Sequence, residues 1–156
     1  MKMPGPALAS DWPALALAAR QMLAQREASV AGNVEKGRLT ASQAADRVRV
    51  ARALSRLWDT IAAGQPPYDF ETAWVVSEGR EGTYPHELRS DLDAAAARAR
   101  TLADRKGEDA AAAAFAEALA ALAWHARPAD HISSIIDVAH ANADFRLRQS
   151  SNRAAA

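Results

Sequence analysis

The sequence predicts an all-α fold, a helical bundle of about five helices in a single domain, 1–156. Three observations support this prediction. Alanine, the strongest helix former, makes up about a quarter of the chain, and β-branched residues are sparse. Large apolar residues recur every three or four positions, which is the period of an α-helix. Residues that cap helices precede these apolar series, and glycine or proline follows them.

The first two predicted helices, 11–36 and 40–63, form an N-terminal antiparallel hairpin. Gly37 stands just after the first helix, where a left-handed residue is favoured. Thr40 and Gln43 have the spacing of a capping box, which begins the second helix. Because a very short turn joins the two helices, they are expected to lie side by side.

Residues 37–58, GRLTASQAADRVRVARALSRLW, partly match a helix-turn-helix. The turn of that motif usually needs a glycine, and Arg49 stands there; Ser55 occupies an apolar position of its second helix. Taken instead as one helix, 41–63 keeps a single apolar side, made of Val50, Ala51, Leu54, Leu57, Trp58 and Ile61. We therefore favour one continuous amphipathic helix.

A connector, 64–84, follows the hairpin, because Gly64 and two prolines interrupt the helical pattern. Residues 68–78 fit two structures. Asp69 can cap a short helix, but apolar residues also alternate as in a strand. We favour the helix, since a lone strand would have no partner in this chain.

Three further helices are predicted after the connector, at about 85–106, 108–127 and 130–149. Pro85 suits a first helical turn, and Gly107 suits a helix end. Residues 1–10 and 150–156 are expected to be flexible.

Composition excludes several classes of function. The chain has 19 Lys and Arg against 19 Asp and Glu, so any grip on nucleic acid must come from a local patch. It has no cysteine, which excludes disulfides and thiolate metal sites. We find no signal peptide and no membrane-spanning segment, and expect a cytoplasmic protein.

No catalytic motif is present: the sequence lacks a P-loop, a dinucleotide-binding glycine pattern and a recognisable triad. We predict no enzyme activity, no cofactor and no metal site. Asp137, His140 and Asp144 share a helical face, but no second ligand-rich helix would complete a site. They are interpreted as an exposed polar stripe.

Four arginines form the first candidate site. Arg49, Arg52 and Arg56 are spaced to share one helix face, predicted to be exposed, and Arg38 lies at the hairpin tip. Such a set suits phosphates or an acidic partner. The alternative is a solvated face whose arginines pair with Asp46 and Asp59.

Aromatic residues of the connector form the second candidate site. Tyr68, Phe70 and Trp74 belong to a cluster of aromatics between 58 and 84. Aromatic side chains anchor many protein interfaces. The alternative is that these rings pin an irregular segment to an alanine-rich bundle.

Residues 22–58 resemble a helical hairpin of small uncharacterised proteins from proteobacteria and their phages. The pattern matches at Gly37, Arg38, Leu39, Thr40 and Ala44. It departs at Ala28 and Ser29, where those proteins often carry an aromatic residue and a valine. The resemblance implies a bacterial, cytoplasmic, phage or mobile-element setting and no activity.

Together these observations favour a non-catalytic accessory protein that binds a protein partner, with a second copy of itself as one candidate. The alternative function is a nucleic-acid-binding regulator that uses the arginine face of helix 40–63. No membrane association is expected.

Overall fold

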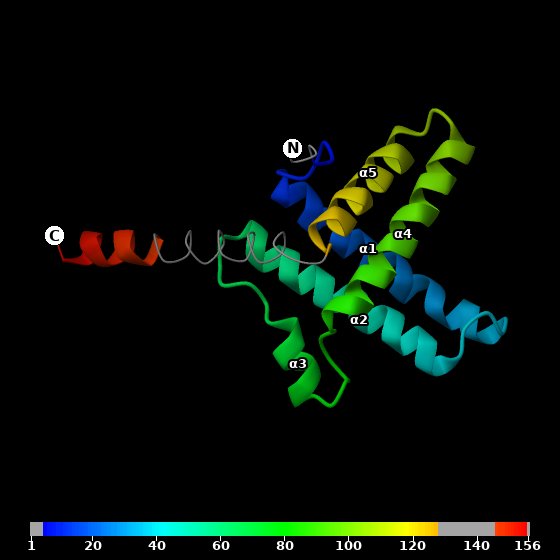
Figure 1. Ribbon diagram of the computed structural model, residues 1–156, viewed down its shortest axis with the longest axis horizontal. Helices are drawn as coiled ribbons and strands as arrows, with labels where there is room; N and C mark the ends of the chain where they lie inside the picture. The colour runs from blue at the N-terminus through cyan, green and yellow to red at the C-terminus, as the bar shows by residue number, and fades with distance from the viewer. Residues whose placement is uncertain (1–4, 128–145, 156) are drawn as a thin grey trace.

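The computed structural model describes residues 5–127 and 146–155, which form helices, turns and loops and no strand (Figure 1). The predicted all-α class is confirmed. The helices are α1 (Trp12–Glu35), α2 (Ala41–Ala62), α3 (Phe70–Val76), α4 (Pro85–Lys106) and α5 (Ala110–His125). A further helical stretch covers 146–154, so the chain is helical beyond the predicted end at 149. Of the helix predicted over 130–149, the part over 130–145, with Asp137, His140 and Asp144, lies outside the described residues.

The first hairpin consists of α1 and α2 packed side by side. The Asp11 side chain caps α1 by accepting the Ala14 N–H at 3.1 Å. Gly37, with a φ of 69°, ends the helix, and the Arg38 N–H returns to the Asn33 carbonyl at 2.9 Å. This is the Schellman arrangement, in which a left-handed glycine lets the last carbonyls find donors.

The second helix of this hairpin begins with the predicted capping box. The Gln43 N–H donates to Thr40 Oγ1 at 3.1 Å, and the Thr40 N–H donates to Gln43 Oε1 at 2.9 Å. From there α2 continues without a break to Ala62, through Arg49 and Ser55. The residues that argued against a helix-turn-helix thus lie inside one continuous helix.

Replacing Thr40 by alanine is expected to lower the free energy of unfolding by about 1 kcal/mol, because one N–H of the first turn loses its acceptor. Urea unfolding followed by circular dichroism measures the loss. Ser42→Ala is the matched control, since Ser42 is exposed in the same turn and the structure gives its side chain no part in the cap. An equal loss in both variants would contradict a role for the capping box.

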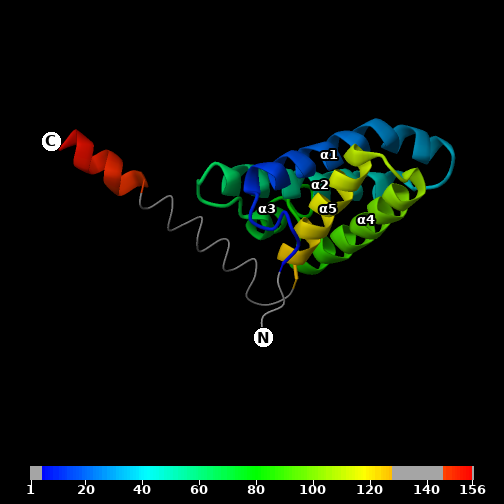
Figure 2. The ribbon, with the colours of Figure 1, turned by 90° about the horizontal axis from the view of Figure 1, so that it is seen from above.

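A second hairpin, α4 and α5, packs obliquely across the first (Figures 1 and 2). Gly107, with a φ of 63°, ends α4, and the Asp109 side chain caps α5 by accepting the Ala112 N–H at 3.0 Å. The predicted arrangement, one hairpin plus three further helices, therefore holds only coarsely. The described chain pairs its four long helices as two hairpins, and α3 stands between them in sequence.

The core lies where the two hairpins meet. Its largest fully buried side chains come from all four long helices and include Leu15, Leu54, Leu88, Leu92, Leu119 and Leu122. Alanines such as Ala19, Ala51 and Ala121 are also fully buried, which lets helix backbones approach closely. Few large side chains therefore fill this core, and each one matters for its packing.

The described part of the N-terminal arm packs on the bundle, although we predicted that residues 1–10 are flexible. Leu8 packs against the core, and the Ala9 carbonyl lies 2.7 Å from Nε2 of the buried His125. The His125 ring also packs on Trp58 and Trp124. These contacts join the arm to the end of α5.

Candidate functional site

The connector is built around α3, a helix of seven residues that projects from the bundle beside α2 (Figure 1). Asp69 caps it by accepting both the N–H and the hydroxyl of Thr72, at 3.0 and 2.8 Å. These two hydrogen bonds lower the pKa of Asp69. Phe70, 6% exposed, anchors the helix in the core. The prediction of a helix in preference to a strand is thus confirmed, and the helix covers Phe70–Val76 of the 68–78 segment.

The return from α3 to α4 needs a glycine at position 82. Gly82 has a φ of 72°, and a Cβ there would collide with the Phe70 carbonyl oxygen and the Trp74 backbone nitrogen. The next residue, the fully buried Thr83, donates its N–H to the Phe70 carbonyl at 3.2 Å. The loop therefore closes directly on the first turn of α3.

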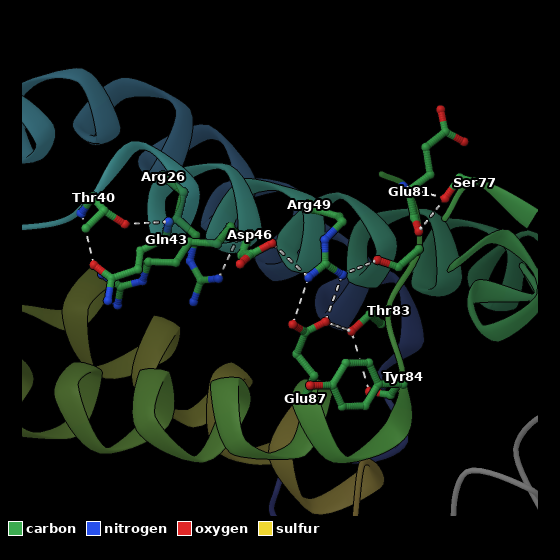
Figure 3. Close-up of polar contacts among 12 residues, drawn as sticks. Arg26, Thr40, Gln43, Asp46, Arg49, Ser77, Glu81, Thr83, Tyr84 and Glu87 are labelled. Atoms are coloured by element: carbon green, nitrogen blue, oxygen red, sulfur yellow. Dashed lines mark hydrogen bonds and ion pairs between the residues drawn. The ribbon is translucent and has the colours of Figure 1, made fainter. Parts of the chain in front are cut away.

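Arg49 of α2 and Glu87 of α4 hold this loop in place (Figure 3). The guanidinium donates from Nη1 and Nη2 to the two carboxylate oxygens of Glu87, at 2.8 and 2.7 Å. Nη1 also donates to the Gly82 carbonyl at 2.8 Å, and Nη2 to Asp46 at 3.2 Å. Thr83 adds its hydroxyl to Glu87 at 2.8 Å. We call these five residues the Arg49–Glu87 network.

The network keeps both of its central groups charged. Burial raises the pKa of Glu87, but hydrogen bonds from Arg49 and Thr83 and the charge of Arg49 outweigh it, so the pKa lies below its ordinary value. The hydrogen bond to Glu87 raises the pKa of Arg49 despite burial. A two-pronged arginine–carboxylate pair is among the strongest hydrogen-bonded contacts in proteins. The loop is therefore fixed by a charged, partly buried clamp.

The prediction that Arg49 lies on an exposed face is wrong, since its side chain is only 8% exposed. The α4 helix and the 77–84 loop cover that part of α2, so a polar helix face became an internal contact. Arg52 and Arg56 are exposed, as predicted. Each lies near a carboxylate, Arg52 at 3.4 Å from Glu27 and Arg56 at 4.0 Å from Glu81.

The other candidate residues divide between core and surface. Phe70 belongs to the core and cannot be an interface anchor while the fold is intact. Tyr68 is half-buried beneath Arg56, whose guanidinium carbon lies 5.6 Å from the ring centre. Trp74 is half-buried and meets Tyr84 edge to face, at 5.3 Å between ring centres. Arg38 is exposed at the tip of the first hairpin.

Sequence reasoning missed the most exposed apolar residues of the connector. Val75 and Val76, at the end of α3, are 68% and 77% exposed, and Tyr84, whose ring meets that of Trp74, is 40% exposed. We call these three residues the α3 patch. The signal was present: Phe70, Ala73, Trp74 and both valines place apolar residues on every side of a two-turn helix. One short helix against a bundle cannot bury all sides.

The connector that carries the α3 patch has more exposed acidic residues than basic ones. Asp69, Glu71, Glu78 and Glu81 are exposed within the connector, and Arg80 is the exposed basic residue among them. The connector therefore combines exposed valines with an excess of negative charge, and such a surface does not suit the phosphates of a nucleic acid.

Among the described residues, no three His, Asp or Glu side chains gather into a group that could hold a metal ion. None of the helices in those same stretches is long and apolar enough to cross a membrane. Comparisons with protein-family models, with curated proteins and with solved structures find no match.

Proposed function

We propose that this chain is a non-catalytic helical interaction protein that docks on a protein partner through its connector. The observation that carries the proposal is the exposure of Val75 and Val76 side by side, at 68% and 77%. Contiguous apolar surface on a soluble domain marks interaction sites more often than chance. Here it lies on a short projecting helix (Figure 1).

The way the connector is held also supports docking. Phe70 fixes the start of α3 in the core, and the Arg49–Glu87 network fixes the loop that returns from α3 to α4. A surface that is ordered before binding loses less conformational entropy when the partner arrives. The network thus gives the α3 patch a fixed shape in the free protein.

The chemistry of the patch describes the partner. Two adjacent exposed valines at the end of a short projecting helix suit an apolar cleft on the partner. The exposed carboxylates of the connector, Asp69, Glu71, Glu78 and Glu81, favour basic residues near that cleft. We therefore propose a protein partner with an apolar groove and a basic rim. We also propose a cytoplasmic, phage or mobile-element setting, because residues 22–58 resemble the helical hairpin of small uncharacterised proteins from proteobacteria and their phages.

The alternative, binding of nucleic acid by the arginine face of α2, has less support. Arg49 is enclosed in the Arg49–Glu87 network, and Arg52 and Arg56 each have a carboxylate nearby. An arginine that already has an anionic partner gives up that contact before it can bind a phosphate. The face that remains is small and partly neutralised.

The experiment compares the tagged full-length chain with the variant Val75→Asp/Val76→Asp as bait in cells that produce the protein naturally. We expect a partner recovered with the unchanged chain to be lost with the variant, while thermal unfolding stays the same, because both valines are exposed. Binding of the purified partner by calorimetry should weaken by about tenfold or more.

The control is Leu17→Asp, an exposed apolar residue of α1 that is 62% exposed and lies outside the connector. It should keep the partner. Light scattering shows whether the partner is a second copy of the chain. Retention of every partner by the double variant, or turnover of a substrate by the purified protein, would refute the proposal.

A further inference from the structure

A pocket of about 280 Å³ lies between the two hairpins, on the side of their tips. Its walls come from α1, α4 and α5, with Leu39 and Arg47 contributed by the first hairpin's turn and α2. The two hairpins cross obliquely and diverge in this direction (Figure 1). The pocket is therefore a product of the way the hairpins cross, and it is separate from the connector.

The floor of the pocket is apolar. Met22 and Leu119 form part of it and are 3% and 2% exposed, and Phe115 packs beside them against the core. Val30 and Leu102 continue the apolar wall toward solvent. Leu102 is 49% exposed, so a large side chain of this wall is left partly uncovered. A ligand that covers these residues would gain the free energy of apolar burial.

Three arginines, Arg26, Arg47 and Arg98, line the same pocket, and no Asp or Glu lines it. Arg26 is held firmly, because its Nη1 donates to the Arg47 carbonyl at 2.9 Å and to Asp91 at 2.8 Å. Its side chain is 11% exposed. Arg98 is exposed at the pocket, and its side chain has no ion pair or hydrogen bond with any other residue that the structure describes. Three positive charges thus meet one carboxylate, that of Asp91.

The excess of positive charge in the pocket affects the ionisation of Arg98. Burial, and then the positive charges of Arg47 and Arg26, lower the pKa of Arg98, and Asp91 only partly offsets them. Like charges that repel one another in a partly enclosed site are stabilised when an anion binds among them. The planar guanidinium group pairs with carboxylates through two parallel hydrogen bonds.

We propose that the pocket binds a small carboxylate with an apolar body. The carboxylate pairs with Arg98 and Arg47, and the hydrocarbon covers Met22, Phe115 and Leu102. A medium-chain alkyl or single-ring aryl carboxylate suits the volume, which is at the small end for ligand pockets. This binding is independent of docking through the α3 patch, and either one can fail without the other.

The test measures binding of sodium octanoate to the protein by calorimetry. Two comparison probes are used: octanol, which has the apolar chain without the charge, and inorganic phosphate, which has the negative charge without the chain. We expect one octanoate per chain and at least tenfold weaker binding of both other probes. Arg98→Gln should raise the octanoate Kd by about tenfold, as expected for loss of one hydrogen bond to a charged group.

The matched control is Arg100→Gln, which removes the same charge from an exposed position of α4 outside the pocket. It should change the Kd by less than twofold. Chemical shifts of the Arg26, Ser29 and Ala99 amides should move with octanoate in the unchanged protein. Equal binding of octanol, equal binding of phosphate, or equal effects of Arg98→Gln and Arg100→Gln would each overturn the proposal, as would no binding of octanoate.

Discussion

Replacing Glu87 by alanine is expected to lower the free energy of unfolding by about 3 kcal/mol, because Arg49 would keep its charge in a buried site without its main partner. Arg49 is 8% exposed and Glu87 21% exposed, so neither side chain can move fully into water while the fold is intact. Asp46 compensates only in part, since it is 56% exposed and bonds Arg49 at the longer distance of 3.2 Å. Urea unfolding measures the loss.

At acid pH, the free energies of unfolding of the unchanged protein and of Glu87→Ala should become more similar. The pKa of Glu87 is lower in the folded protein than its ordinary value of 4.5, so its ionised form stabilises the fold. That contribution is complete above pH 4.5 and is lost as the pH falls through the folded-state pKa. The raised pKa of Arg49 lies far above this range, so Arg49 stays charged throughout.

The control for both measurements is Glu117→Ala, because Glu117 is exposed on α5, away from the network. This substitution should lower the free energy of unfolding by about 0.5 kcal/mol or less. A loss of that size in Glu87→Ala, or a difference between the two proteins that does not change below pH 4.5, would contradict the account of the network. The double variant Arg49→Met/Glu87→Leu should recover much of the stability, since it leaves no buried charge.

Replacing Leu92 by alanine is expected to cost about 3 kcal/mol, through lost apolar burial and the cavity that remains. Leu92 of α4 is fully buried, and together with Leu122 of α5 it lies against Leu54 and Trp58 of α2. These residues surround a void of only about 10 Å³. The packing is thus close, and deletion of most of a leucine side chain opens a new cavity.

Thermal and urea unfolding measure this loss, with Leu102→Ala as the control on the same helix. Leu102 is 49% exposed, so its truncation should cost about 0.5 kcal/mol or less. If the two variants lost the same stability, the interface between the hairpins would not be the main source of stability. The alanine-rich core makes the expected contrast large, because few other side chains can move to fill the space.

Local features of the fold were predictable from the sequence. The capping box of Thr40 and Gln43 and the glycine end at Gly37 involve residues within a few positions of one another. Hydrophobic periodicity likewise depends on neighbouring turns, so it indicates helix existence and approximate ends. For these reasons the continuous helix through Arg49 could be distinguished from a helix-turn-helix.

The partner of Arg49 could not be predicted in the same way. Glu87 is 38 positions away in sequence, and a helical wheel shows which face is polar without showing what will cover it. The same limit applies to the pocket. Arg26, Arg47 and Arg98 come from three helices, and only the crossing of the two hairpins brings them together.

The close fit of Gly82 against α3 limits which residues can change during evolution. A related chain that keeps this connector must keep a glycine at that position, because any side chain would strike the backbone. Arg49 and Glu87 can be lost together for an apolar pair, but the loss of one alone leaves a buried charge. Positions 49 and 87 should therefore change together during evolution, while position 82 stays fixed. Relatives that keep this connector are therefore expected to carry a glycine at position 82 together with either a charged pair or an apolar pair at positions 49 and 87.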